Sequence, residues 1–299
     1  MAAWKLGTTS DLYLDSNWQA TLVSEEAAVE MLAKTGFDAL DFGVFEHQGK
    51  TGRFWGTDYL DQAKSIAEAA QKAGIEFSQA HAPMFDYAAP DSAAMFDLTL
   101  RSFEIAKVLG APYLVIHPQF LPGAIYGRRH NEQLEYNLSF YRSFLDISAK
   151  TGVKIALENM YGHDPQTDAN CPTYFSLMDE ILEFLDCTED REQFVVCLDT
   201  GHAHIIGKES VSDCIRKLDT DLKLLHIHDN FGDKDSHMPP FHGNIDWKDT
   251  VHALREIGYT GALSLEAQNL SLRYPISDLA LRQKSVELCY QSLKHISEL

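Results

Sequence analysis

Eight short apolar runs alternate along the chain with longer segments whose apolar residues follow helical spacing, as Ala27, Met31 and Leu32 do. Strands that alternate with helices predict a parallel sheet, and eight is the number of strands that closes a (β/α)8 barrel. We therefore expect an α/β protein that forms a single TIM-barrel domain over residues 1–299. The runs cover residues 5–9, 37–42, 75–81, 113–117, 153–158, 194–199, 222–228 and 262–266.

Charge and cysteine content restrict the partners and the compartment. The chain has 25 Lys and Arg residues against 44 Asp and Glu residues, a formal net charge of −19. Nucleic acids and anionic membranes bind through Lys and Arg, so this charge opposes both as partners. No apolar run reaches the roughly 18–20 residues that span a membrane. The five cysteines are scattered and form no Cys-x-x-Cys pair, which is typical of reduced thiols in a cytoplasmic protein.

Six of the apolar runs end in a residue that can bind a metal or move a proton. Successive members lie roughly 30–40 residues apart, which is about one strand-plus-helix unit of a barrel. Parallel strands of a barrel all end at the same face, so we expect the six side chains to meet at the C-terminal mouth, where such barrels carry their active sites. The six residues are His81, His117, Glu158, Asp199, His228 and Glu266.

Side-chain alternation refines this prediction, because positions i and i−2 of a strand share a face. Glu158 shares its face with Ala156, and Asp199 shares its face with Cys197, so small residues lie below these two carboxylates. His226 lies one layer below His228 on the same face. We interpret His226 as a hydrogen-bonded histidine of the barrel core rather than a ligand.

The segment 224–247, which reads LLHIHDNFGDKDSHMPPFHGNIDW, adds Asp235 and His237 directly behind the seventh strand. Imidazole and carboxylate groups are common ligands of divalent metals. The predicted set of Glu158, Asp199, His228 and Glu266 makes an oxygen-rich site for one divalent ion, and its composition does not choose among Mn²⁺, Mg²⁺, Co²⁺ and Zn²⁺. Further metal ions are compatible with the chain, and Asp235 and His237 are the candidates for a second.

Short motifs surround these residues, namely Ala80-His81-Ala82-Pro83, Ile116-His117-Pro118, Leu157-Glu158-Asn159, Leu198-Asp199-Thr200-Gly201-His202, His226-Ile227-His228-Asp229-Asn230, Asp235-Ser236-His237, Gly243-Asn244-Ile245-Asp246-Trp247 and Leu265-Glu266. Together they resemble the xylose-isomerase-like TIM-barrel superfamily of sugar isomerases and epimerases, which includes ketose 3-epimerases, inosose dehydratases and endonuclease IV. The resemblance covers essentially the whole barrel and is specific for the superfamily, although it does not name a substrate.

The resemblance also implies roles for individual residues. In the epimerase branch, residues that match Glu158, Asp199, His228 and Glu266 hold one divalent metal, and the two glutamates act as acid and base on opposite faces of the substrate. In the endonuclease IV branch, a three-zinc cluster is completed by positions that match His81, His117, His202, Asp235 and His237.

We further expect His81, His117, His202 and Lys234 to contact the substrate. The chain departs from the ketose 3-epimerases at two points, which argues against a simple ketohexose 3-epimerase. Residues 229–234 lack the arginine that those enzymes carry there, and residues 160–163 replace their substrate-binding glutamate.

The predicted function is that of a metal-dependent isomerase or epimerase of sugars or polyols. The chemistry is proton abstraction next to a carbonyl through an enediolate, with Glu158 and Glu266 as base and acid. A lyase or dehydratase acting on a keto-inositol or an oxidised glycoside would use the same first step. An endonuclease IV-like nuclease fits the ligands but is opposed by the net charge, and a non-catalytic metal-binding barrel is the weakest alternative. The oligomeric state is left open, and a homo-oligomer is compatible with the sequence.

Overall fold

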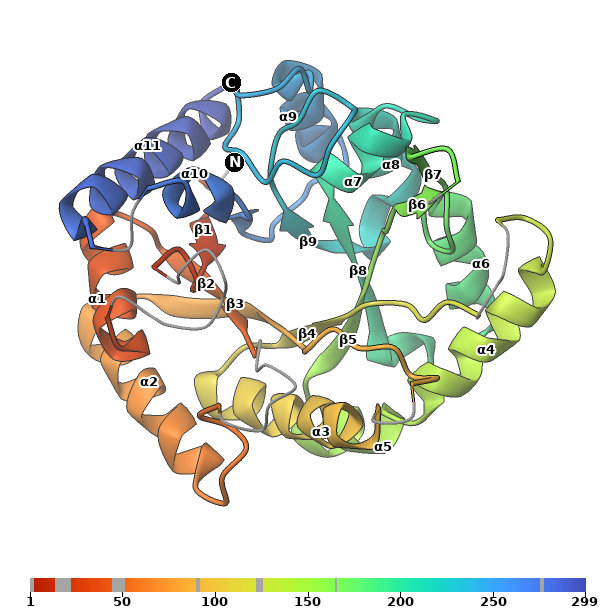
Figure 1. Cartoon of the computed structure of the whole chain (residues 1–299), viewed down its shortest axis with the longest axis horizontal. Helices are drawn as coiled ribbons and strands as arrows, with labels where there is room; N and C mark the ends of the chain where they lie inside the picture. The colour runs from red at the N-terminus through yellow and green to blue at the C-terminus, as the bar shows by residue number, and fades with distance from the viewer. Residues whose placement is uncertain are drawn as a thin grey trace.

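The computed structural model describes residues 3–13, 23–44, 52–89, 92–121, 126–164, 166–274 and 277–299. Its main sheet has eight parallel strands in the order β10-β1-β2-β3-β4-β5-β8-β9. An isolated parallel bridge between Ile227 and Leu265 joins the two ends of this order, with Ile227 N donating to Ser264 O at 2.8 Å. The strands therefore form the (β/α)8 barrel that the sequence predicts, and Figure 1 shows the helices as a ring around it.

The strands of the barrel lie close to the predicted runs. Strands β3, β5 and β8 end at His81, Glu158 and Asp199, as predicted. The other three ligand-bearing strands end one or two residues early, so His117, His228 and Glu266 begin the loops that follow β4, β9 and β10. The eight strands are β1 (Leu6–Thr9), β2 (Ala39–Gly43), β3 (Glu76–His81), β4 (Tyr113–Ile116), β5 (Lys154–Glu158), β8 (Phe194–Asp199), β9 (Leu222–His226) and β10 (Leu263–Leu265).

The helices begin and end where local chemistry favours it. In α1, the side chain of Ser24 accepts from Ala27 N at the first turn, and Gly36 ends the helix with a φ of 118° that suits glycine. The larger helices are α1 (Glu25–Thr35), α2 (Tyr59–Ala73), α3 (Ser92–Leu109), α4 (His130–Arg142), α5 (Leu145–Thr151), α6 (Met178–Cys187), α7 (Thr200–Ile206), α8 (Val211–Leu218), α9 (Trp247–Glu256) and α11 (Leu279–Ser297).

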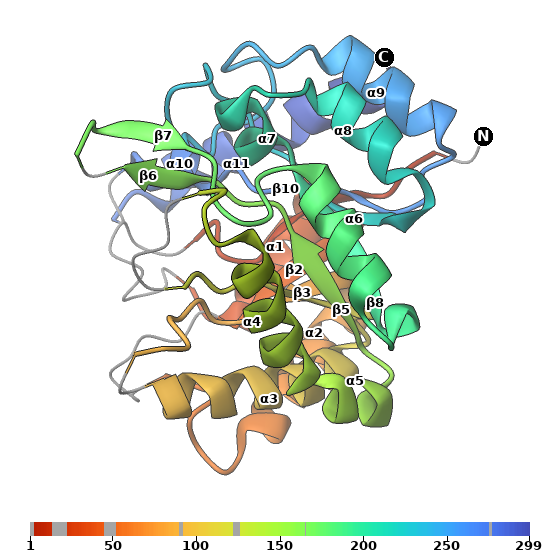
Figure 2. The same cartoon turned by 90° about the vertical axis from the view of Figure 1, so that its right-hand side faces the viewer.

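A short antiparallel hairpin, β6 (Gly162–Asp164) with β7 (Ala169–Cys171), follows β5. Figure 2 shows this hairpin at one end of the barrel and the N-terminus at the other. The hairpin comes directly after Glu158, so it lies at the mouth of the barrel, beside the C-terminal ends of the strands. No helix within the described residues has both the length and the apolar character needed to cross a bilayer.

The barrel encloses a small apolar cluster that is separate from the large core between the sheet and the helices. Its buried members include Ala156, Val195, Cys197 and Leu224. Ala156 and Cys197 are the residues expected one layer below Glu158 and Asp199 on the inner face. The apolar layer gives the barrel a packed floor, and polar side chains fill the layers above it.

Candidate metal centre

The ends of β3, β4 and β5 bring two histidines against one glutamate. The Nε2 atoms of His81 and His117 lie 3.1 Å apart. Both face the same oxygen of Glu158: Oε2 is 3.4 Å from His81 Nε2 and 3.0 Å from His117 Nε2. Three donor atoms from neighbouring strands therefore point at one small volume, which is the arrangement that a bound cation needs.

Three carboxylates meet at the centre of the mouth. Glu158, Asp199 and Glu266, together with His226, each offer a donor atom within 4.8 Å of the others. Burial opposes ionisation of Glu158, but His226 and His117 beside it outweigh burial and hold its pKa well below the usual range. The glutamate is thus an anion in a buried site, a suitable ligand for a metal.

His226 bridges this group to the layer beneath. Its Nδ1 lies 3.0 Å from Glu158 Oε1 and 3.2 Å from Glu266 Oε2, and its Nε2 lies 2.9 Å from Asp41 Oδ2. Gln79 Nε2 also donates to Asp41 Oδ2, at 2.9 Å. His226 is therefore hydrogen-bonded inside the barrel, as predicted, and it also belongs to the group of possible metal ligands that contains Glu158, Asp199 and Glu266. The sequence analysis did not identify Asp41 and Gln79. Each is a polar residue inside a predicted strand, and the two strands that carry them, β2 and β3, pair with each other.

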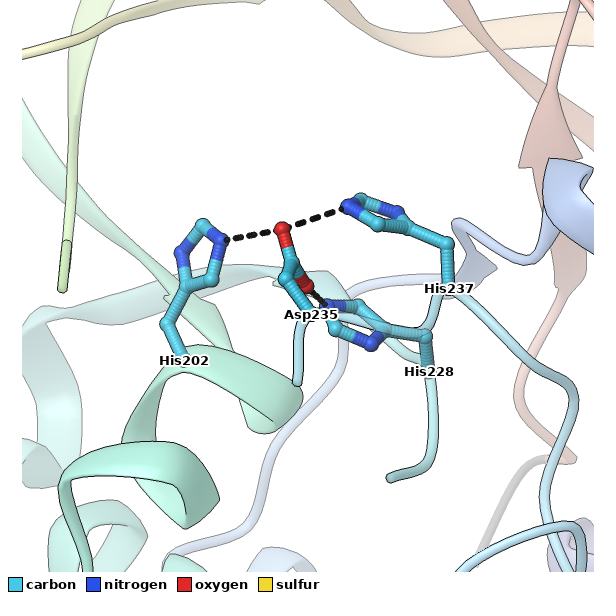
Figure 3. A group of neighbouring side chains, drawn as sticks. All are labelled: His202, His228, Asp235 and His237. Atoms are coloured by element: carbon cyan, nitrogen blue, oxygen red, sulfur yellow. Dashed lines mark hydrogen bonds and ion pairs between the residues drawn. The ribbon is translucent and has the colours of Figure 1, made fainter. Parts of the chain in front are cut away.

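A second cluster consists of His202, His228, Asp235 and His237, whose donor atoms also lie within 4.8 Å of one another. Figure 3 shows Asp235 at its centre, between the three imidazoles. Asp235 Oδ2 is 2.9 Å from His237 Nε2 and 3.5 Å from His202 Nε2, and Oδ1 is 3.5 Å from His228 Nε2. We use "the second cluster" for these four residues below.

Two of the three residues that supply the central carboxylates, Asp199 and Glu266, also contact the second cluster. Asp199 Oδ1 is 3.0 Å from His228 Nε2, and it also accepts from the backbone N–H of His202 at 2.7 Å, which caps the N-terminus of α7. Glu266 O lies 3.1 Å from Nδ1 of His237. His228 therefore contacts Asp199 of the central carboxylates and Asp235 of the second cluster. The imidazole that the structure groups with Glu158, Asp199 and Glu266 is that of His226, one layer lower.

Histidines of the second cluster hold protons tightly when no cation neutralises Asp235. Burial alone would lower the pKa of His202, but Asp199 and Asp235 raise it to about 10. The hydrogen bond to Asp235 likewise outweighs burial and raises the pKa of His237 to about 9. Burial would raise the pKa of Asp235, but the same two histidines hold it far below the usual range. A metal ion that binds these imidazoles must displace their protons.

The donor set fits a divalent ion on structural grounds. Asp235 Oδ1 is buried and accepts no hydrogen bond within the described residues, so a lone pair of this carboxylate remains unused inside the site. Three neutral imidazoles with one carboxylate suit Zn²⁺ or Co²⁺, and the three carboxylates at the centre suit Mn²⁺ or Mg²⁺ as well.

Most of the predicted site residues contact one another in a continuous chain across the mouth. Lys234 differs, because it is exposed and its carbonyl accepts from Ser236 Oγ at 3.2 Å. Tyr161 also reaches this site, because its hydroxyl lies 3.4 Å from Asp235 Oδ2. Tyr161 precedes the β6–β7 hairpin, so this hairpin is tied directly to the second cluster.

Comparison with known proteins assigns the chain to a family. The model of the xylose isomerase-like TIM barrel family matches residues 29–290, and the chain belongs to this family. An uncharacterized protein of Methanocaldococcus jannaschii is 26% identical over 274 residues, which cover 89% of this chain and 84% of that protein.

Two further relatives carry functional names. The inosose isomerase of Halalkalibacterium halodurans is 30% identical over 169 residues, covering 54% of this chain and 55% of that protein. A probable endonuclease 4 of Oceanobacillus iheyensis is 24% identical over 237 residues, covering 72% of this chain and 74% of that protein.

Solved structures share the fold at low sequence identity. The zinc-bound IOLI protein is 21% identical and superposes with a TM-score of 0.73, over 98% of each chain. A D-tagatose 3-epimerase-like protein is 24% identical with a TM-score of 0.69, also over 98% of each chain. At these identities the likeness establishes the barrel and leaves the reaction to the residues at its mouth.

Proposed function

We propose that this protein is a metal-dependent isomerase or epimerase that moves a proton next to the carbonyl of a sugar or polyol-derived ketone. The carrying observation is the convergence of Glu158 and Glu266, whose carboxylate oxygens lie within 4.8 Å of each other at the mouth of the barrel. They come from strands on different sides of the barrel, so they can approach one substrate carbon from two faces. The relative named inosose isomerase and the structural neighbour named D-tagatose 3-epimerase-like protein support this class of chemistry.

Each group has a role in this proposal. Glu158, Asp199, His228 and Glu266 hold one divalent ion, and the other three members of the second cluster, His202, Asp235 and His237, provide for another. When bound, the ion polarises the carbonyl oxygen and its neighbouring hydroxyl and stabilises negative charge on them. One glutamate removes the α-proton and the other returns a proton. His81, His117 and His202 donate hydrogen bonds to substrate hydroxyls, and Lys234, which is exposed, reaches the substrate only from the rim.

The first test follows the substrate hydrogen in D₂O. Ketohexoses, keto-inositols and 3-keto-glycosides are incubated with the metal-loaded protein, and deuterium is located by NMR at the carbon next to the carbonyl. We expect solvent deuterium in an inverted or isomerised product. An unsaturated product would instead assign elimination, the alternative that uses the same abstraction step. Turnover of a good substrate without deuterium uptake and without elimination would refute proton abstraction.

Glutamine variants identify the groups that move the proton. Glu158→Gln and Glu266→Gln keep the shape of the side chain but remove its basicity, so we expect turnover to fall by ~10²–10⁴-fold at saturating metal. Metal content is measured on the same samples, because both residues are also proposed ligands. Glu68→Gln, an exposed glutamate on α2, is the matched control and should retain full activity. Near wild-type turnover in both site variants would contradict the assignment.

A further inference from the structure

The buried carboxylate of Asp229 organises the long loop between β9 and α9. Its side chain is fully buried directly after His228. Oδ1 accepts from the backbone N–H groups of Asn230 at 2.9 Å and Ile245 at 3.2 Å. Oδ2 accepts from Phe241 N at 2.9 Å and from the indole Nε1 of Trp247 at 3.0 Å. One side chain thus ties together both ends and the far side of a loop that would otherwise have to leave these N–H groups unpaired.

The backbone of the loop is closed around this carboxylate. Asp229 N donates to Met238 O at 2.7 Å, and Asn244 N donates to Asn230 O at 3.0 Å. A side chain at Gly243 would place its Cβ only 2.3 Å from Asp229 Oδ1 and 2.2 Å from Asn230 O. Glycine is therefore required at residue 243 for the chain to pass this close to Asp229.

The segment held in this way carries half of the second cluster. Asp235 and His237 lie between the donors at 230 and 241, and His237 has a left-handed backbone with a φ of 41°. A non-glycine residue in this region costs energy and persists only where the surrounding structure enforces it. The fixed loop delivers the strained His237 to within 2.9 Å of Asp235 Oδ2.

We propose that Asp229 is a positioning residue for the second cluster: it touches none of the four cluster side chains through its own carboxylate, and it sets their affinity for a divalent ion through the loop. The inference rests on the proposed function only in treating that cluster as a metal site. It does not depend on which reaction the barrel catalyses, because the ion can be counted without substrate.

The test uses Asp229→Asn, which preserves size but replaces one acceptor oxygen with an NH₂ group. Two of the four N–H donors then face a donor, and the loop must open locally. Co²⁺ and Zn²⁺ are titrated separately into metal-free protein, followed by visible absorbance and chelator competition. We expect the affinity of the second cluster to fall by about 10–100-fold, as for other residues that orient ligands, while the ion at the central carboxylates is retained. Thermal denaturation is recorded to verify folding.

Two comparison variants define the readout. His237→Ala removes a cluster residue outright and should abolish the same binding event, so adding Asp229→Asn to it should have no further effect on the remaining ion. Asp246→Asn is the matched control, because its exposed side chain accepts from Asp249 N at the start of α9 and asparagine serves as well there. It should bind both ions as the wild type does.

Three results would overturn the inference. The first is wild-type affinity for both ions in Asp229→Asn. The second is unchanged binding in His237→Ala, because it would show that the cluster holds no ion. If Asp229→Asn fails to fold, Trp247→Phe removes a single donor and should weaken the second ion by about two- to tenfold. Unchanged affinity in that folded variant is the third. Failure of deuterium exchange in the catalytic test would leave all of these ion counts unaffected.

Discussion

Replacing Gly201 with alanine should displace His228 from the proposed metal centre. Gly201 lies in the first turn of α7, directly against the buried imidazole. An added Cβ would lie 1.8 Å from Cε1 of His228, 2.3 Å from Nδ1 and 2.5 Å from Nε2, whereas ordinary contacts begin near 3.4 Å. The ring must therefore retreat by about 1.6 Å, the difference between 3.4 and 1.8 Å, which far exceeds the ~0.2 Å tolerance of ligand distances.

Two quantities should change in Gly201→Ala. Metal affinity should fall by at least the ~10–100-fold seen when a ligand is merely misoriented. Stability without metal should fall by about 1–3 kcal/mol through overpacking, partly offset by the ~1 kcal/mol that alanine gains over glycine in a helix. Chelator competition measures the affinity, and urea denaturation in excess chelator measures the stability.

The control is a double-mutant cycle with His228→Ala, which removes the ring that the new methyl group meets. In that background Gly201→Ala should be neutral or stabilising by up to ~1 kcal/mol. Wild-type metal affinity in Gly201→Ala would refute the reasoning. An equal stability penalty with and without the His228 ring would also refute it, because the clash would then lie elsewhere.

Two other predictions concern charge. Burial raises the pKa of Glu180 on α6 to about 7 from an ordinary value of 4.5, so its contribution to stability is lost as pH rises through this window. Glu180→Gln should therefore raise the free energy of unfolding at pH 8 by up to about 3 kcal/mol, and the melting temperature should rise with it. At pH 4 both quantities should be unchanged. Equal effects at the two pH values would contradict this. The formal charge of −19 predicts no useful affinity for duplex DNA at physiological salt. Fluorescence anisotropy that shows submicromolar binding, or cleavage at an abasic site, would favour a nuclease instead.

The positions that sequence could predict are those fixed by regular geometry. A strand has a period of two residues and a barrel ends all its strands at one face, so the placement of Glu158 and Asp199 follows from where an apolar run stops. The small inner residues Ala156 and Cys197 follow from the same rule. Where a strand ends one residue early, as β4 does before His117, the side chain still reaches the mouth.

The parts that sequence could not predict depend on contacts between distant segments. The interaction of His226 with Asp41 joins residues from β9 and β2, and no local pattern specifies which strands place their polar residues in the same layer. Asp229 follows a strand and reads locally as one more acidic residue of a polar loop. Its role becomes visible only when the N–H groups of residues 241 and 245 are seen to turn back toward it.

The two groups of proposed ligands are supported by different kinds of structure, and this difference bears on function. Glu158 and Asp199 project from buried strands, so their geometry is as rigid as the barrel itself. Asp235 and His237 depend on a loop that is held by hydrogen bonds to one carboxylate, and loops of this kind change more readily than strands. Changes in the loop can therefore alter the second cluster and the shape of the mouth without disturbing the central carboxylates. Under the proposed function, such a barrel keeps its proton-transfer groups on the strands while its loops select the substrate.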